Sequence, residues 1–566
     1  MHNNIFWIII RRMRTPLLVI IITFSITILG LVLIPGVDSN GKPYHMTFLD
    51  AIYFVSFMAS TIGFGEIPYE FTYAQRLWVL FSIYISVIGW FYAIGALVTL
   101  IQDKNLILEL NVAKFNKKIQ NLKEHFVIIL GYNHSTRELI KQLTADGKRV
   151  VVLDKSQEKI DELELEHFVP EVYALKANVE SPDILRLAGI KKRNCKAIVS
   201  LFDNDFKNTK IALLAKLINN KINIIVKSST TEQTQHLKNL GIKNIVDPFN
   251  LIANRFYLAI SAPHLWILEQ MLFGHDLYIH DNEQLPKGKY IICGYGRMGK
   301  ALRSSLQKTD TDCSFIDLKS AKHKAEKKSA IFGDAQDYQA LLEAGIEDAV
   351  AIIAATKDDL INLTILLTAK KINPDIYTIA RENTLDDVTI FQAAKIDRVY
   401  ILEKIVSEYV HRVISQPMAH QFLQIIHQHT EEWGEEVVEE LKRKTCYHPE
   451  IFEVRIVKSE AYALTNYLKD GNKVRLGQIA RDLSNREKRA KIHFLMVKNR
   501  KEEVTLLPDD NYEVKVSDRF LIAATPEARE NFELLINNVN EFEYTITGHE
   551  LQFGILKKIL EVKEEI

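Results

Sequence analysis

The sequence predicts an all-α membrane module that is followed by two Rossmann-like, doubly wound α/β domains and a small α+β lobe. Two apolar runs near the N-terminus are each long enough to cross a bilayer as a helix. Behind them, a pattern of alternating strands and helices occurs twice, at an offset of about 155–165 residues. Such alternation implies parallel sheets. The last part of the chain differs, with strand patterns at 452–457 and 494–497.

Length and composition limit the possible functions. The 566 residues suggest about three or four domains. Lysine plus arginine and aspartate plus glutamate are equal at 71 each, so charge gives no argument for nucleic acid as a partner. The four cysteines show no C-x-x-C spacing, so neither a zinc site nor a redox motif is expected from them.

The two apolar runs cover residues 17–34 and 77–101. A helix needs about 20 residues to cross a bilayer core of about 30 Å, so both runs suffice. Arginines precede the first run and lysines follow the second. The positive-inside rule then places both termini in the cytoplasm of a multi-pass protein of the cell (inner) membrane. A cleaved signal peptide is the alternative for the first run, but its apolar region would be shorter, with a small-residue cleavage site after it.

The segment between the two runs has the features of a pore loop. A short apolar stretch at 47–59 has the length of a helix but cannot span a bilayer. After Ser60, the chain continues with Thr61, Ile62, Gly63, Phe64 and Gly65. Non-helical backbone at membrane depth is tolerated where it lines a cavity. Gly63 and Gly65 can adopt positive φ, which lets successive carbonyls point at one axis.

Four such loops around one axis would stack rings of carbonyl oxygens that replace the hydration shell of K⁺. The carbonyls of 61–65 are therefore the expected K⁺ ligands, and the Thr61 hydroxyl adds one more ring. A glycine-containing extracellular hairpin is the alternative for this string.

Residues 47–66 resemble the pore helix and selectivity filter of potassium channels, which usually read T-V-G-Y-G-D. The resemblance implies a potassium-selective, homotetrameric channel in the lipid bilayer. The sequence departs from the pattern at Ile62, Phe64 and Glu66. Phe64 lacks the hydroxyl that in many relatives braces the filter, so a weakly selective cation channel is an alternative. In similar channels an inner-helix glycine is a gating hinge, for which Gly89 is the candidate; close helix packing is the other interpretation.

The remainder of the chain is organised around the repeat. The apolar helical segment 251–277 is expected to cross over to a partner domain. The expected boundaries are 1–102 for the two-span pore domain, 103–124 for a lysine-rich helical linker, 125–286 for the first α/β copy with its crossover helices, 287–435 for the second copy and 436–566 for the C-terminal lobe.

The second copy carries an intact G-x-G-x-x-G turn between a strand and a helix, at Gly294, Gly296 and Gly299. The first glycine makes the turn, the second lets a pyrophosphate approach and the third packs the helix on the strand. The phosphate then lies at the helix N-terminus, which brings Arg297 and Met298 to the site. Asp317 ends the next strand, where an acid can bond a ribose hydroxyl.

The first copy departs from this motif. Gly131 is retained, but Asn133 and Thr136 replace the later glycines and would crowd a dinucleotide. Asp154 remains at the end of the second strand. A mononucleotide in an altered pose is the expected ligand, with Gly131, Asn133, His134 and Asp154 around it. For either copy, a Rossmann-like sheet that binds nothing is the alternative.

Residues 125–265 and 287–415 resemble the regulator-of-K⁺-conductance domain (RCK, or TrkA-N), which forms cytoplasmic gating rings on potassium channels and occurs on K⁺ uptake systems. The resemblance adds Gly333 and Asp334 to the second site, near the adenosine. It implies a ring of eight such domains in a tetramer, with NAD(H), ADP or ATP as the gating ligand. A calcium site of an archaeal relative does not carry over, because the first copy has 226–229 as V-K-S-S instead of acids. Residues 508–523 resemble the TrkA-C lobe that follows such domains.

A membrane-anchored NAD-dependent oxidoreductase would explain the glycine-rich turn but leaves the pore loop unexplained. No proton-transfer pair stands out in the sequence, so the chain is expected not to be an enzyme. The grouped histidines His420, His427 and His429 have no aspartate or cysteine to complete a metal shell, so a packed or surface role is expected for them.

Overall fold

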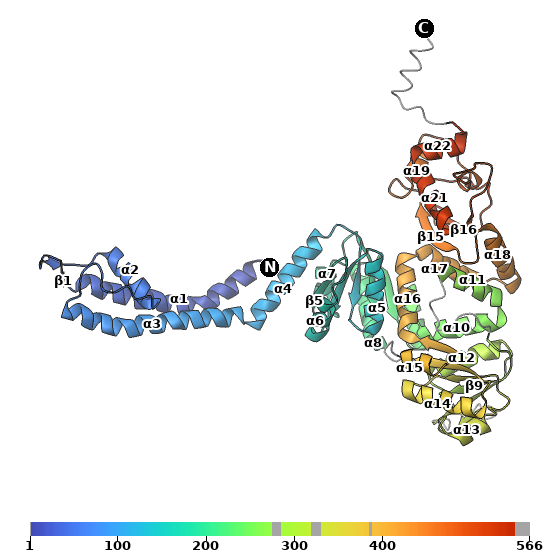
Figure 1. Cartoon of the computed structure of the whole chain (residues 1–566), viewed down its shortest axis with the longest axis horizontal. Helices are drawn as coiled ribbons and strands as arrows, with labels where there is room; N and C mark the ends of the chain where they lie inside the picture. The colour runs from blue at the N-terminus through green and yellow to red at the C-terminus, as the bar shows by residue number, and fades with distance from the viewer. Residues whose placement is uncertain (1, 274–284, 319–329, 384–387, 550–566) are drawn as a thin grey trace, which may run out of the picture. The chain divides into compact units, whose positions relative to one another are not determined.

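Two long apolar helices and two parallel sheets form most of the computed structural model, which describes residues 2–273, 285–318, 330–383 and 388–549. The chain divides into two compact units, Met1–Lys123 and Glu124–Ile566 (Figure 1). Each unit is a fold of its own.

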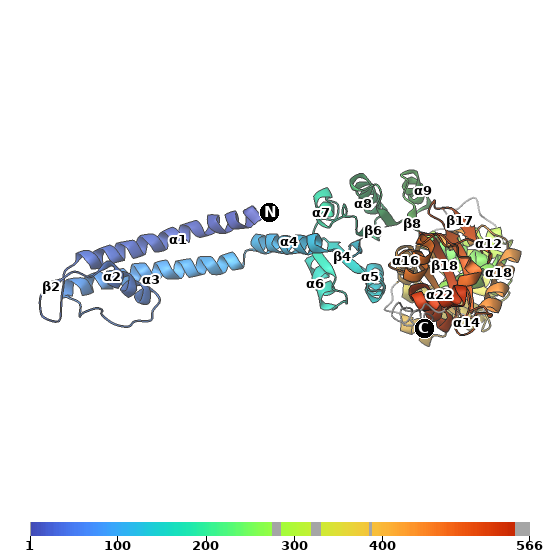
Figure 2. The same cartoon turned by 90° about the horizontal axis from the view of Figure 1, so that it is seen from above.

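The first unit contains the helices of the membrane module. Helices α1 and α3 are long and apolar enough to cross a membrane, by length and composition. They run side by side, and the short apolar helix α2 packs on both (Figure 1 and Figure 2). The elements are α1 (His2–Leu33), β1 (Gly36–Val37), β2 (Pro43–Tyr44), α2 (Phe48–Ala59), α3 (Tyr73–Ile101) and α4 (Lys104–Asn121).

Close packing joins α1 to α3. The Trp78 indole of α3 fills the space left by Gly30 of α1, where a Cβ would collide with the ring. Its Nε1–H donates to the Thr27 carbonyl oxygen at 3.1 Å. Small residues at helix contacts are typical of membrane proteins, because dispersion rather than hydrophobic burial holds such helices together.

The second unit contains two six-stranded parallel sheets with the same doubly wound strand order. In the first copy the order is β5-β4-β3-β6-β7-β8, and in the second it is β11-β10-β9-β12-β13-β14. The central strands β3 and β9 are fully buried because helices cover both faces. The strands of the first copy are β3 (Phe126–Leu130), β4 (Arg149–Asp154), β5 (Tyr173–Lys176), β6 (Cys195–Ser200), β7 (Asn223–Lys227) and β8 (Asn244–Val246). Those of the second are β9 (Tyr290–Cys293), β10 (Cys313–Asp317), β11 (Ala330–Phe332), β12 (Ala351–Ala354), β13 (Tyr377–Glu382) and β14 (Arg398–Ile401).

Most helices of the first copy have a counterpart in the second among the described residues, α6 being the exception. In the first copy they are α5 (His134–Ala145), α6 (Gln157–Leu165), α7 (Pro182–Leu187), α8 (Asp205–Ile218) and α9 (Thr231–Asn239). In the second they are α12 (Arg297–Lys308), α13 (Tyr338–Glu343), α14 (Asp359–Ile372) and α15 (Val388–Ala393). The predicted fold class is confirmed in both copies.

The two copies exchange the helices that follow their sheets. Helix α10 (Pro248–Ser261) leaves the first copy and packs on α12 of the second, where Phe256 and Leu302 share one core. Helix α16 (Leu402–Ser415) leaves the second copy and packs on α5 of the first. The expected crossover of 251–277 is therefore present as far as α11 (Pro263–Phe273); residues 274–277 lie outside the described part of the chain.

The C-terminal lobe is built on a four-stranded antiparallel sheet of order β15-β18-β16-β17. One face packs on α19, α21 and α22. The other face packs on α11, α17 and α18, so the crossing helices continue into this lobe. The elements are α17 (Pro417–Ile426), α18 (Glu431–Lys444), β15 (Glu450–Arg455), α19 (Tyr462–Lys469), α20 (Leu476–Ile479), β16 (Ile492–Lys498), β17 (Val504–Leu506), β18 (Arg519–Ala524), α21 (Pro526–Asn537) and α22 (Val539–Thr547).

A buried ion pair fixes the turn between α10 and α11. Arg255 Nε lies 2.9 Å from Glu269 Oε1, with side chains only 9% and 4% exposed. His427 Nε2 lies 3.1 Å from the other carboxylate oxygen. Although burial opposes ionisation, Arg255 and His427 lower the pKa of Glu269 to about 2. Of the grouped histidines, His420 is buried against Tyr409, whereas His427 is exposed and bonds Glu269 from the surface.

We expect Glu269→Gln to lower the free energy of unfolding by about 3–5 kcal/mol, because it leaves the Arg255 charge buried without its counter-ion. Since the pKa of Glu269 falls from 4.5 to about 2 in the folded chain, the stabilisation is present above about pH 4.5 and is lost as the pH falls towards 2. The measurement is urea denaturation of the purified full chain at several pH values.

The matched control is Glu533→Gln, which removes one partner of the exposed Arg529–Glu533 pair. This variant should lower the free energy of unfolding by about 0–1 kcal/mol, because water screens such pairs. Equal costs for the two variants would contradict the buried-pair argument.

Candidate pore loop and nucleotide-binding site

The pore loop has the backbone that its glycines suggested. Gly63 and Gly65 have φ values of 69° and 104°, and Thr61 adds a third positive value of 62°. Ile62 and Phe64 lie between them outside the left-handed region. Alternation of this kind turns successive carbonyls towards the same side of the chain, which is the arrangement that coordinates a dehydrated cation.

Side chains behind the loop hold it against α2. The Phe64 ring lies 5.6 Å from Phe57 in an edge-to-face contact. Phe57 in turn contacts Phe54 at 5.1 Å, and Phe54 contacts Phe71 at 5.0 Å. Helix α2 itself begins with the Thr47 side chain as its N-cap. Aromatic pairs of this geometry contribute beyond their buried area, so the loop rests on a continuous aromatic row.

Glu66 and Arg76 form a contact that sequence reasoning missed. Arg76 Nε donates to Glu66 Oε1 at 2.9 Å, and a second guanidinium nitrogen donates to Oε2 at 3.0 Å. The two residues are ten positions apart, with a loop and a helix start between them. No spacing rule pairs residues across such a turn, so no sequence signal could have found them.

Gly89 lies at the contact between α3 and α1. A Cβ at this position would lie 2.9 Å from Thr23 Oγ1. The contact supports the packing interpretation of Gly89, whereas its role as a gating hinge stays a prediction.

The glycine-rich turn of the second copy has the shape that a phosphate requires. Gly294 has a φ of 96°. A Cβ on Gly299 would collide with the Gly294 carbonyl oxygen, so the helix can come this close to the turn only because residue 299 is glycine. A Cβ on Gly296 would meet no described atom within 4 Å. Gly296 begins α12 without a side-chain cap among the described residues, so the helix N-terminus faces open space.

Asp317 completes this edge of the sheet. It ends β10 beside the glycine-rich turn, and its Oδ2 accepts the Tyr295 N–H at 2.7 Å. Gly333 and Asp334 directly follow β11, and Asp334 Oδ1 accepts the Gln336 N–H at 3.0 Å. The carboxyl ends of β9, β10 and β11 thus bring together the turn, Asp317 and the Gly333–Asp334 pair, which is where doubly wound sheets bind ligands.

Two of the predicted residues point elsewhere. The Met298 side chain is fully buried in the core beneath α12. The Arg297 guanidinium lies 4.7 Å over the Phe249 ring of α10 and donates to the Ser229 carbonyl oxygen at 3.5 Å, so it reaches towards the first copy. Arg381, which sequence reasoning did not select, lies on the same ring at 5.3 Å. Burial, and then the charge of Arg297, lower the pKa of Arg381 to about 10.

The first copy closes the corresponding helix end with its own side chains. Asn133 Oδ1 accepts the Thr136 N–H at 3.0 Å, and Thr136 Oγ1 accepts the Asn133 N–H at 2.8 Å. This reciprocal cap satisfies donors that would otherwise face a phosphate. Asp154 accepts the Tyr132 N–H at 2.8 Å, as Asp317 does in the second copy, and His134 is exposed at the helix start. The acid is retained, and the helix end where a phosphate would bind is capped by Asn133 and Thr136; nucleotide binding by this copy stays a prediction.

Two protein-family models match the chain. A family model described as an ion channel matches residues 16–103. The TrkA-N domain model matches residues 127–248 and again 290–402. The chain is an ion-channel module joined to two TrkA-N domains. The pore loop lies in the region that the ion-channel model matches, and the strand-to-helix turns at Gly131 and Gly294 lie near the starts of the two TrkA-N matches.

Individual relatives match parts of the chain. Potassium channel protein 1 of Methanocaldococcus jannaschii is 39% identical over 105 residues, which are 17% of this chain and 32% of that protein. The voltage-gated potassium channel Kch of Escherichia coli is 26% identical over 214 residues, 37% of this chain and 48% of Kch. The chain thus covers 32% of the length of the first of these relatives and 48% of the second. The solved structure of the GsuK channel bound to NAD is 15% identical, with a TM-score of 0.47 and coverage of 94% of this chain and 99% of that one.

Proposed function

We propose that this chain is one subunit of a potassium-selective channel that a cytoplasmic nucleotide opens or closes. The observation that carries the proposal is the row of positive φ values at Thr61, Gly63 and Gly65, between two helices long enough to span a membrane. Carbonyl oxygens aligned by such a backbone can replace the hydration shell of K⁺. The TrkA-N domains of the same chain supply a place for the nucleotide.

The shape of the pore loop supports an assembly of several subunits, for which we propose a homotetramer. One loop presents oxygens from a single direction, so several copies must surround the ion. The side chains of Ile62 and Phe64 are 61% and 67% exposed in one subunit. Neighbouring subunits would cover these apolar groups, and four chains would carry eight TrkA-N domains. Basic residues at both cytoplasmic ends of the spans support a cell-membrane protein with its termini inside.

The second TrkA-N copy is the proposed nucleotide site. Its helix N-terminus is open for a phosphate, and Asp317 lies where a ribose would bind. A carboxylate at this place accepts hydrogen bonds from the hydroxyls of an unmodified ribose and repels a 2′-phosphate. The ligand class is therefore NAD(H), ADP or ATP. The pair of guanidinium groups at Phe249 adds positive potential beside the site.

Ligand binding would act on the pore through α4, which continues from α3 with only Gln102 and Asp103 between them. Arg12 of α1 lies 2.7 Å from Asp103, at the start of α4. A pull on α4 would therefore reach both spanning helices. The nucleotide can bias this movement only by the difference between its affinities for the closed and open states.

Planar bilayer recordings of the purified chain test the proposal. A K⁺ gradient against Na⁺ should give a reversal potential close to that of K⁺, and NAD(H), ADP or ATP on the cytoplasmic side should change the open probability. Equal permeability to K⁺ and Na⁺ would instead indicate a weakly selective cation channel. A conducting channel whose open probability no nucleotide changes would refute ligand gating.

A further inference from the structure

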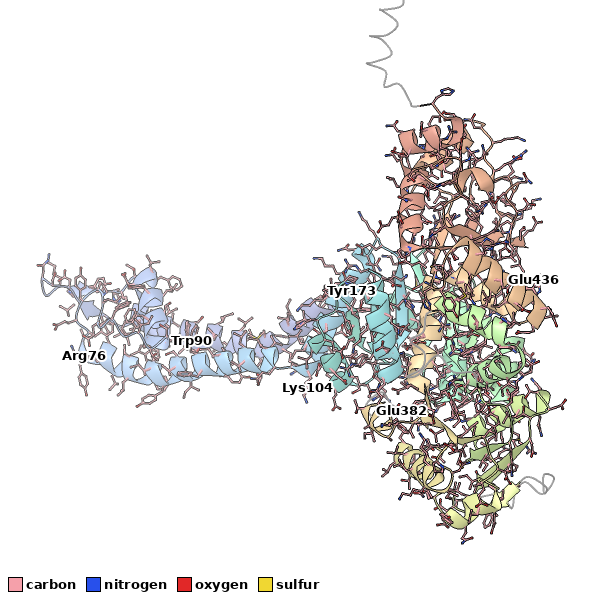
Figure 3. All side chains as sticks on the ribbon, turned by 45° about the vertical axis from the view of Figure 1, so that its right-hand side comes forward. Arg76, Trp90, Lys104, Tyr173, Glu382 and Glu436 are labelled. Carbon is pink, nitrogen blue, oxygen red and sulfur yellow. The ribbon has the colours of Figure 1, made fainter. Side chains whose placement is uncertain are left out.

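The outer end of the pore loop is tied to the outer end of α3. Glu66 directly follows the last glycine of the loop, and Arg76 lies in the first turn of α3; Figure 3 labels Arg76 at this end of the first unit. The two nitrogens of Arg76 bond separate oxygens of Glu66 at 2.9 and 3.0 Å. The Phe71 N–H donates to Glu66 Oε2 at 2.7 Å. We call Glu66, Arg76 and the Phe71 amide the outer clamp.

The geometry of the outer clamp separates it from an ordinary surface ion pair. Exposed pairs contribute little, because each side chain must give up its freedom for a contact that water weakens. A bidentate guanidinium fixes both distance and orientation. The backbone donor of Phe71 adds a third bond to the same carboxylate. Since the Arg76 and Glu66 side chains are 58% and 34% exposed, these three bonds, and not burial, position the Glu66 carboxylate.

The outer clamp and the aromatic row meet at Phe71. The Phe71 ring lies 5.0 Å from Phe54, which continues the row that supports Phe64. The amide of the same residue bonds Glu66. The loop is thus fixed from behind by rings and at its outer end by the ion pair. Neither support needs a hydroxyl on the residue at position 64.

We propose that Glu66 and Arg76 are positioning residues for ion selectivity. The clamp keeps the carbonyls of the pore loop at the spacing that suits K⁺, and without it the loop would close around the smaller Na⁺. The inference rests on the proposed function. It differs from a role for Glu66 as a charge that attracts cations to the mouth, because Arg76 would oppose such a role and supports this one.

The two roles predict opposite patterns in the variants Glu66→Gln and Arg76→Gln. A cation-attracting Glu66 would make the first variant lower the conductance and the second raise it. The clamp requires both to act alike, and each should raise the permeability of Na⁺ relative to K⁺ by about tenfold, the equivalent of one lost charge-assisted contact. The double variant should be no worse than either single one, because both remove the same contact. Arg76→Lys keeps the positive charge but loses the two parallel hydrogen bonds of the guanidinium, and it should retain part of the selectivity.

Reversal potentials in bilayers provide the measurement, and gel filtration of each detergent-solubilised variant checks assembly. The matched control is Glu70→Gln, which removes an exposed acid of the same loop that acts on Arg76 through its charge but makes none of the clamp's three hydrogen bonds, and it should leave selectivity unchanged. If the wild type is selective and both Gln variants keep that selectivity, the proposed role of the clamp is wrong and the proposed function stands. Loss of assembly in all clamp variants but not in Glu70→Gln would also overturn it, in favour of a purely structural pair. A wild type that does not distinguish K⁺ from Na⁺ would overturn both.

Discussion

Replacing Gly63 by alanine is expected to abolish K⁺ current. Gly63 has a φ of 69°, where an L-residue costs about 1–2 kcal/mol. In a tetramer the cost occurs four times, or about 4–8 kcal/mol, unless the loop abandons the conformation that aligns its carbonyls. Thr61 already has a strained, positive φ in this loop, which leaves little tolerance for a second strained residue. Current at a fixed amount of reconstituted protein should fall by about 100-fold or more.

The chain offers a matched control in Gly41. Its φ of 76° is almost the same, and a Cβ there would meet no described atom within 4 Å. Gly41 lies in a turn in which its N–H donates to the Asp38 carbonyl oxygen at 3.0 Å, away from the pore loop. Gly41→Ala should therefore carry similar local strain but near-normal current. If Gly63→Ala conducts as well as Gly41→Ala does, the loop does not conduct ions through its backbone.

Replacing Asp317 by asparagine should weaken nucleotide binding by about 10–100-fold, because a hydrogen bond to a charged group is worth about 1.5–3 kcal/mol. The amide oxygen of asparagine can still accept the Tyr295 N–H, which bonds Asp317 at 2.7 Å. The turn should therefore keep its shape. Isothermal titration of the purified chain with NAD, ADP and ATP gives the dissociation constants.

Asp154→Asn in the first copy is the control for this prediction. Asp154 accepts the Tyr132 N–H at 2.8 Å, so the two aspartates have the same backbone role. Asn133 and Thr136 cap the helix end beside Asp154 with their own side chains, so fewer donors are left there for a phosphate. Asp154→Asn should therefore change the affinity much less. A larger loss in Asp154→Asn than in Asp317→Asn would place the nucleotide in the first copy.

Local patterns carried most of what could be predicted from the sequence. The apolar runs, the short helix before the pore loop and the strands of both copies depend on periodicity within a few turns of chain. The need for glycine at Gly299 also follows from the motif, and the collision of a Cβ there with Gly294 gives the physical reason. The aspartates at the ends of β4 and β10 were found by their spacing from the glycine-rich turns.

Contacts between segments that are distant in the sequence could not be predicted from it. The direction of Arg297 depends on α10, which comes from the other copy and brings Phe249 to it. The role of His427 depends on Glu269, 158 positions away in the chain. A sequence pattern has no information on which side chains the exchange of helices places together. Met298 shows the same limit, because its place in the motif predicts a ligand contact and its side chain lies in the core.

The sequence by itself determined the kind of backbone at the pore loop, because glycine at 63 and 65 permits the positive φ values that align carbonyls. It also determined the doubly wound sheets, because buried strands alternate with helices in each copy. Only the tertiary structure decided what holds the loop, since Glu66 meets Arg76 through the packing of α3 beside α2. It likewise decided which copy keeps an open helix end, because capping depends on where the Asn133 side chain turns.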